Sequence, residues 1–284
     1  MYAWYLLIRD LLGRAAAGWQ RHNSWQMSAA LAFYSLLSLA PLCVLAIAVA
    51  SFWFGDKAAR GELFTQLDGL LGAEGAAAVQ NLVARSHALE WSGPASFVGI
   101  ATLLIGASAV FGQLQESMNT IWETPPVKGL GLGVFVRQRL IAFAMTLAMG
   151  GLLIVSLLLS AAISGVRTYL PEDQPLLVEV SGWSNDVIAL VLLFGLVALI
   201  FKFLPDRRVP FRDVWPGALC TAILLAVGKW ALAWYLGAGG FASAYGAAGS
   251  LVVVILWVYY SSQILFFGAE LTHALSVLRA KARA

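Results

Sequence analysis

Charged residues are scarce in this sequence. Aspartate, glutamate, lysine and arginine make up 12% of its 284 residues, about half the share found in an ordinary soluble domain. Apolar residues make up 60%, and the mean hydropathy is +0.80, so a soluble fold would lack the polar side chains needed to cover its surface. The composition therefore indicates a protein whose surface mostly faces lipid, and it excludes an intrinsically disordered chain.

Cysteines and recognisable catalytic motifs are also nearly absent. The two cysteines, Cys43 and Cys220, lie in long apolar runs, which excludes a disulfide-stapled secreted module. The sequence has no P-loop, no G-x-S-x-G elbow and no H-E-x-x-H helix. We therefore expect no enzyme, no metal and no cofactor. The net charge of +3 is too small to indicate a nucleic-acid partner.

Long apolar runs are what the sequence does have. Six of them are long enough to cross roughly 30 Å of hydrocarbon as helices that rise about 1.5 Å per residue. They cover residues 28–54, 95–112, 140–164, 184–204, 214–236 and 247–269. The alternation of polar and apolar residues that is typical of barrel strands is missing. The predicted fold is all-α, a single membrane domain over residues 1–284 with six transmembrane helices.

Lysine and arginine are distributed unevenly between alternate loops. Thirteen of the 18 fall in the N-terminal segment, in the loops after the second and fourth spans, and in the C-terminal tail at 270–284. The positive-inside rule then predicts a multi-pass membrane protein with both termini in the cytoplasm. Residues 1–27 are predicted to hold an amphipathic helix on the inner leaflet. The extracytoplasmic stretch 55–93 has the spacing of short amphipathic helices.

Several residues in or beside the spans are candidates for function. Pro41 predicts a kink in the first span, because it cannot donate to the carbonyl of Leu37; packing alone also explains a kink. Lys229 lies inside the fifth span, where it either extends to the outer interface or pairs within the bundle. Glu270 ends the sixth span. It is expected either to form a structural ion pair with the basic loops after spans two and four or to take part in proton coupling.

A polar stripe is predicted where the second span continues into the cytoplasm as a helix that stops at Pro125. Its residues recur with helical spacing: Gln113, Glu116, Asn119, Thr120 and Glu123. The stripe is typical either of a cytoplasmic vestibule or of the solvated face of an emerging helix. Near the outer end of the fifth span, five glycines between 237 and 249 predict a break, and Gly249 begins the sixth helix either as a plain turn or as an anion-binding N-terminus.

Four blocks of the sequence resemble the YihY/BrkB family of bacterial inner-membrane proteins. They are SAALAFYSLLSLAPL (28–42), FGQLQESMNTIWE (111–123), KFLPDRRVPFRDVWPGAL (202–219) and SAYGAAGSLVVVILWVYYSSQILFFGAELTHA (243–274). The resemblance implies a six-helix, multi-pass protein of the bacterial inner membrane and no settled activity. It also implies that the ribonuclease label once given to the family is a misassignment. The residues that it marks as functional or structural are Pro41, Glu116, Asn119, Pro205, Asp206, Gly217, Tyr245, Gly246, Gly249 and Glu270.

These features together predict a transporter or flippase-like protein for an amphipathic, anionic envelope substrate such as a lipid. The expected partners are membrane lipids and a second copy of the chain. A rim of Arg137, Arg139, Arg207 and Arg208 would attract the headgroup. The expected substrate path holds Pro41, Glu116, Asn119, Glu123, Lys229, Tyr245, Gly246, Gly249 and Glu270. The alternative is a non-catalytic membrane scaffold or regulatory subunit.

Overall fold

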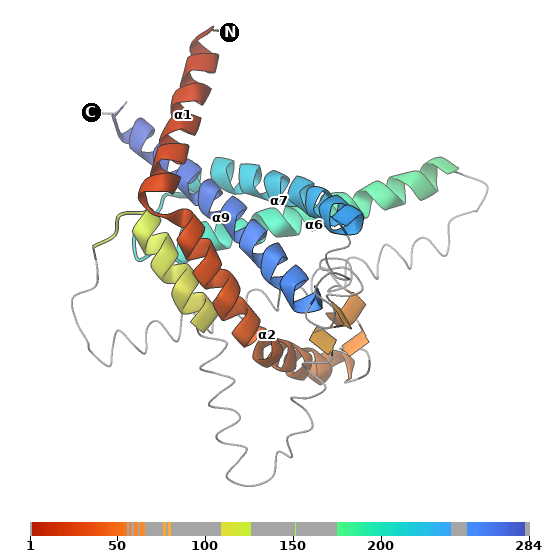
Figure 1. The fold of residues 1–284 in the computed structure, drawn as a ribbon. Helices are drawn as coiled ribbons and strands as arrows, with labels where there is room; N and C mark the ends of the chain where they lie inside the picture. Colours follow the sequence, from red (N-terminus) through yellow and green to blue (C-terminus); the bar gives the residue numbers. More distant parts are fainter. Residues whose placement is uncertain are drawn as a thin grey trace.

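The computed structural model describes residues 2–55, 109–125, 175–239 and 249–281, together with residue 151 and several residues between 57 and 80. Its labelled helices are α1 (Tyr2–Arg21), α2 (Ser24–Phe54), α6 (Pro175–Phe203), α7 (Phe211–Gly239) and α9 (Gly249–Lys281). A further helix covers residues 109–121. No strand occurs in these ranges, so the predicted all-α class is confirmed for them (Figure 1).

Several described helices are long enough to cross a bilayer, and two of them are also apolar enough over their described residues. α2, α6 and α7 contain 31, 29 and 29 residues, whereas a span needs about 20. Among the described side chains, Phe211–Lys229 and Val252–Lys281 are long and apolar enough to cross a membrane, and Val187–Phe203 is a shorter apolar helix. The predicted second and third spans lie mostly outside the described residues. The number of six spans and the orientation therefore stay predictions.

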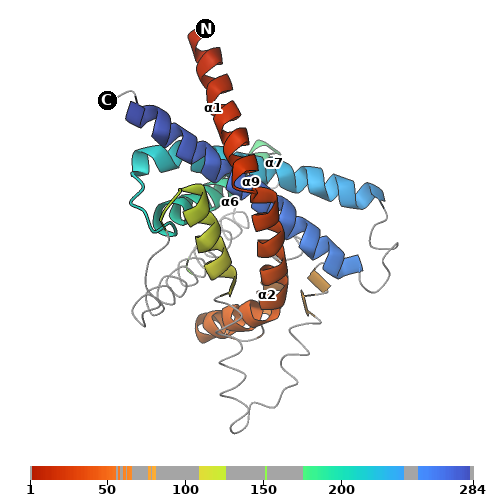
Figure 2. The same ribbon diagram turned by 60° about the vertical axis from the view of Figure 1, so that its left-hand side comes forward.

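α9 holds the described helices together. It contacts α1, α2 and α7, and α7 in turn contacts α6; the two views in Figures 1 and 2 show α1 and α9 crossing. One apolar core is shared by several of these elements. It includes Leu31 of α2, Phe201 of α6, Val214 of α7 and Phe266 of α9, each at most 5% exposed. Burial of such side chains is worth about 1.5–3 kcal/mol each in water, but in a bilayer close packing replaces this term.

Two glycine–threonine pairs let α7 and α9 approach each other closely. A Cβ atom at Gly217 would clash with the hydroxyl of Thr272, and one at Gly268 would clash with the hydroxyl of Thr221. Each hydroxyl also donates a hydrogen bond to the glycine carbonyl of its own helix, over 2.7 Å from Thr221 and 2.8 Å from Thr272. Small residues and satisfied hydroxyls are the usual means of close helix packing in membranes, so this crossing gives Gly217 a structural role.

The start of α7 is held by the end of α9. Pro216 lies inside α7 and has no N–H to donate to the carbonyl of Arg212, four residues earlier. Arg279 of α9 donates to that carbonyl over 2.6 Å and to the carboxylate of Asp213 over 2.7 Å. The predicted tail at 270–284 therefore continues α9 as a helix as far as Lys281.

The N-terminal helices also differ in detail from the predicted boundaries. α1 ends at Arg21 and α2 begins at Ser24, so the first long helix starts four residues before the predicted span. α2 continues through Pro41, and its ribbon changes direction along its length in both Figure 1 and Figure 2. This bend agrees with the kink predicted for a helix in which the carbonyl of Leu37 loses its donor.

Candidate functional site

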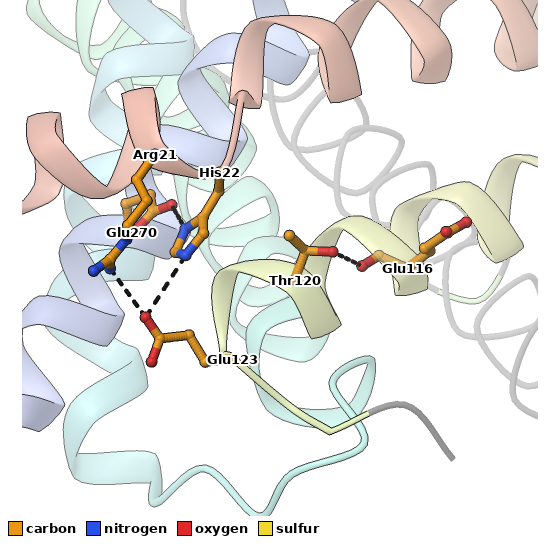
Figure 3. A network of polar contacts seen from close by, with 6 residues as sticks. All are labelled: Arg21, His22, Glu116, Thr120, Glu123 and Glu270. Atoms are coloured by element: carbon orange, nitrogen blue, oxygen red, sulfur yellow. Dashed lines mark hydrogen bonds and ion pairs between the residues drawn. The ribbon is translucent and has the colours of Figure 1, made fainter. Parts of the chain in front are cut away.

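Charged side chains gather where α1, α9 and the 109–121 helix meet (Figure 3). Glu270 of α9 lies at the centre of this group and is only 2% exposed. Its Oε1 lies 2.6 Å from Nδ1 of His22, the residue that follows α1. Removing a carboxylate from water is costly unless a charged or hydrogen-bonding partner compensates it. His22 is the partner that compensates Glu270.

The backbone of α1 covers the other side of this carboxylate. Gly18, one turn before His22, lies so close that a Cβ atom there would clash with Oε2 of Glu270. His22 is then aimed by a turn in which Asn23 takes the left-handed conformation at φ 52° and donates from its backbone N–H to the carbonyl of Gln20 over 3.1 Å. Asparagine tolerates this conformation better than most residues do. The short turn between α1 and α2 therefore places His22 on Glu270.

Glu123 approaches His22 from the opposite side of the ring. Its Oε1 lies 3.7 Å from Nε2 of His22 and 3.0 Å from a guanidinium nitrogen of Arg21. His22 thus stands between two carboxylates, one bonded to Nδ1 and one facing Nε2 (Figure 3).

The 109–121 helix ends in a way that the sequence did not indicate. The backbone N–H groups of Glu123 and Thr124 donate to the carbonyls of Thr120 and Asn119, over 3.1 and 2.9 Å. This is the Schellman pattern, with Glu123 in the left-handed conformation at φ 48°. A residue other than glycine pays roughly 1–2 kcal/mol for that conformation. The helix was predicted to stop at Pro125, but its last residue is 121, so Glu123 lies in the turn beyond the helix and does not continue the helical stripe.

The rest of the predicted stripe is divided between two surroundings. Glu116 and Thr120 are exposed, the Thr120 hydroxyl donates to the Glu116 carbonyl over 3.0 Å, and the Glu116 side chain points away from the charged cluster (Figure 3). Asn119 instead turns toward the connection between α6 and α7. Its amide donates to Oδ2 of Asp206 over 2.8 Å, and its Oδ1 accepts from the Asp206 N–H over 2.8 Å.

Asn119 and Asp206 are both among the residues that the family resemblance marks, and the structure shows that they contact each other. Gln115, one turn earlier, also lies 3.4 Å from the Asp206 carboxylate. These contacts fix the 109–121 helix to the loop at 204–210, where Lys202 also donates to the carbonyl of Val209. Asn119 therefore connects the 109–121 helix to the α6–α7 connection, and it does not line the same surface as Glu116.

Aromatic and polar side chains continue the site along α9. The ring of His273, three residues after Glu270, lies 5.2 Å from the ring of Trp122. In the other direction, the amide of Gln263 lies seven residues before Glu270, which places both on one face of the helix. Both amide atoms of Gln263 are buried, and neither has a hydrogen-bond partner in the described structure. An unpaired buried amide is costly, so Gln263 marks an interior place where a polar group of a ligand would be stabilised.

The remaining predicted residues are placed as follows. Lys229 of α7 is exposed and makes no ion pair with any described carboxylate. Arg207 and Arg208 are exposed on the α6–α7 connection. Gly249 is the first residue of α9, as predicted. The residues that lie outside the described part of the chain are Arg137, Arg139, Tyr245 and Gly246.

The sequence missed the partner of Glu270. The basic loops after the second and fourth spans were expected to supply it, whereas His22 supplies it from the N-terminal segment. Gly18 and Arg21 were missed with it. The available signal was local: Asn23 interrupts the helical pattern directly after the amphipathic run, which places His22 at a helix end. Within the described ranges, no group of three or more His, Cys, Asp or Glu residues is arranged to hold a metal ion.

Comparison with known proteins gives a family match over nearly the whole chain. The model of the family described as virulence factor BrkB matches residues 15–284, which confirms the resemblance seen in the four sequence blocks. A UPF0761 membrane protein of Chromobacterium violaceum is 30% identical over 88% of this chain and 58% of its own length. A second one, from Xanthomonas campestris, is 25% identical over 98% of this chain and 65% of its own.

These relatives are named as membrane proteins, and their names state no activity. The chain spans about three fifths of the length of the curated relatives that it matches. No protein of solved structure matches it.

Proposed function

The chain belongs to the virulence factor BrkB family of bacterial membrane proteins, and we propose that it transports an amphipathic, anionic envelope substrate such as a lipid. The observation that carries this proposal is the polar face of α9, where a buried carboxylate and a buried unpaired amide lie two turns apart. An ionisable group inside a membrane bundle is by default a candidate for a substrate or ion pathway.

Stability alone does not account for this polar face. An apolar pair of similar volume would replace a buried ion pair at little cost or with a gain, and the amide of Gln263 makes no compensating hydrogen bond. An amide offers both donors and acceptors, which suits a headgroup that carries phosphate and hydroxyl oxygens. We infer that Gln263 contacts the headgroup while the apolar flanks of α9 contact its chains.

Basic residues near the site supply the preference for an anion. Arg207 and Arg208 are exposed on the connection that Asn119 and Asp206 fix in place. Each basic residue close to an anionic surface is worth about 1 kcal/mol. These arginines would raise the local concentration of an anionic lipid beside the bundle.

A scaffold or regulatory subunit is the second candidate. It is favoured by the ion pairs that join separate segments in the described part of the chain, such as Arg21 with Glu123 and Arg279 with Asp213. It is also favoured by the close packing of α7 on α9. This candidate predicts a protein partner that copurifies in fixed ratio, and no movement of lipid.

Reconstitution of the full chain into vesicles separates the two candidates. The vesicles contain a fluorescently labelled phosphatidylglycerol in one leaflet, and the exchange between leaflets is followed by quenching from outside. The proposal predicts exchange well above that of empty vesicles, and about tenfold slower exchange for Gln263→Leu, the size expected when one hydrogen bond is lost. Gln26→Leu is the matched control, because it makes the same substitution at an exposed position of α2. Exchange equal to that of empty vesicles, with several anionic lipids and a folded protein, would refute transport.

A further inference from the structure

We propose that Glu123, His22 and Glu270 form a proton relay that carries protons from the surface of the protein to the buried face of α9. The role of the relay rests on the proposed function, since proton uptake would be coupled to the transport of the substrate. Its existence is tested without any transport. The geometry supports it in three ways: a gradient of exposure, the placement of both ring nitrogens, and the attachment of α1 to α9.

Exposure decreases in order along the three residues. The side chain of Glu123 is 54% exposed, that of His22 is 9% exposed, and that of Glu270 is 2% exposed. A proton taken up from water at Glu123 would therefore pass through the imidazole before it reaches the carboxylate inside the bundle. Histidine suits the middle position, because it exchanges protons near neutral pH and has two separate ring nitrogens.

Both nitrogens of His22 face a carboxylate. The distance of 2.6 Å between Nδ1 and Oε1 of Glu270 requires a proton on that line. With Glu270 ionised, this proton belongs to Nδ1, and Nε2 faces Glu123 over 3.7 Å. A small rotation of the exposed Glu123 side chain would bring this contact to hydrogen-bond length.

The transfer balances with one proton. Glu123 takes a proton from water and gives it to Nε2 of His22, and the proton on Nδ1 passes to Oε1 of Glu270. Glu123 is again a carboxylate, His22 is neutral with its proton on Nε2, and Glu270 is a neutral carboxylic acid. The net change is one proton bound at Glu270, and no other co-reactant is needed.

Other charged groups around the relay keep its ends distinct. Arg21 at the end of α1 forms an ion pair with Glu123 over 3.0 Å, which holds the outer carboxylate of the relay in place. The positive charges of Arg21 and of a protonated His22 attract the Glu270 carboxylate, whereas the negative charge of Glu123 repels it. His273 of α9 lies one turn beyond Glu270. It interacts electrostatically with the charges of Glu123, Arg207, His22 and Arg21. These are the titratable and charged groups that face the relay from the described elements.

Protonation of Glu270 has a structural consequence. Hydrogen bonds to an ionised acceptor are roughly twice as strong as those between neutral groups. A neutral Glu270 therefore holds His22 less firmly, and with it the end of α1 that covers this part of α9. The relay thus links proton uptake to the contact between α1 and α9, on the same helix face as Gln263.

Infrared difference spectroscopy of the full chain in detergent tests the relay directly. A pH drop is applied, and the carbonyl stretch of a protonated carboxyl group is recorded over time. The band of Glu270 is identified by its loss in Glu270→Gln. We expect this band to grow when the pH falls. In Glu123→Gln and in His22→Gln it should grow about 100-fold more slowly, the lower end of what a positioned proton-transfer group contributes.

Asp10→Asn is the matched control, because it also removes one carboxylate charge from a half-exposed side chain, which pairs with Arg14 outside the relay, and it should leave the rate unchanged. The relay is refuted if Glu270 takes up no proton at any pH at which the protein is folded, or if Glu123→Gln protonates as fast as the wild type. Glu123 is half exposed, so this variant keeps the test valid even where His22→Gln fails to fold. Vesicles that show no lipid exchange would refute the proposed transport and leave this result standing.

Discussion

α9 makes two contacts that use polar residues in opposite ways. Where α9 packs against α7, each threonine hydroxyl donates its hydrogen bond to a carbonyl of its own helix. The glycine of the neighbouring helix only packs against that hydroxyl. Against α1, the carboxylate of Glu270 depends on His22, which belongs to a separate segment. The first contact is complete once the two helices meet. The second is stable only while α1 stays in place, so it is the contact that a bound proton or ligand can change.

The largest effect is expected from removing one side of the dependent contact. Glu270→Ala leaves His22 buried without its partner, and such a loss is worth about 3–5 kcal/mol. We expect a large fall in the thermal unfolding temperature in detergent. Glu270→Gln keeps a hydrogen-bonding group and should lose much less. Equal stability of Glu270→Ala and the wild type would show that His22 does not rely on Glu270.

Overpacking the self-contained contact should have the next largest effect. Gly268→Ala places a Cβ atom against the hydroxyl of Thr221, and overpacking of this kind costs about 1–3 kcal/mol. Gly112→Ala serves as the control, since a Cβ atom there meets nothing within 4 Å. If both alanine variants unfold at the wild-type temperature, α7 and α9 do not cross as closely as described.

The joint between the 109–121 helix and the α6–α7 connection should be slightly less sensitive. Asn119→Ala removes two part-buried hydrogen bonds of 2.8 Å to Asp206. A hydrogen bond contributes about 0.5–1.5 kcal/mol net, and water replaces part of it at such a site, so we expect a total loss of about 1–2 kcal/mol. Chemical unfolding of Asn119→Ala and Asp206→Ala, singly and together, measures the pair. Additive losses in the double variant would exclude a direct contact between these two residues.

The smallest change in stability is expected at Glu123. Glu123→Gly relieves a left-handed conformation that costs roughly 1–2 kcal/mol, but it adds flexibility to the unfolded chain and removes a partly exposed ion pair. We expect a net change of less than about 1 kcal/mol in the free energy of unfolding, together with slow protonation of Glu270. A large loss of stability would assign Glu123 to the packing of the fold.

The sequence predicted the parts of this structure that follow from local patterns. Apolar runs gave the helices over α2, α6, α7 and α9, and the glycine break gave the start of α9 at Gly249. Glu270 stood out because it is a charge at the end of an apolar run. Each of these signals lies within a few turns of helix, where residue spacing decides which side chains share a face.

The contacts between distant segments could not be predicted in the same way. His22 and Glu270 lie 248 positions apart, and no local pattern relates them. The stop of the 109–121 helix near Pro125 was predicted, but the left-handed turn at Glu123 was not, because glycine is the usual signal at that position. The two glycine–threonine pairs were visible as small residues at a spacing of four, but only the structure shows that Gly217 faces Thr272 and that Gly268 faces Thr221.

A double-mutant cycle on His22→Gln and Glu270→Gln tests the central claim most directly. The free energy of unfolding is measured for the wild type, for both single variants and for the double variant. If the buried carboxylate depends on the imidazole, the two losses will differ from additivity by about 0.5–3 kcal/mol, as expected for residues in direct contact. Losses that simply add would contradict the pairing, and the relay built on it would fall with it.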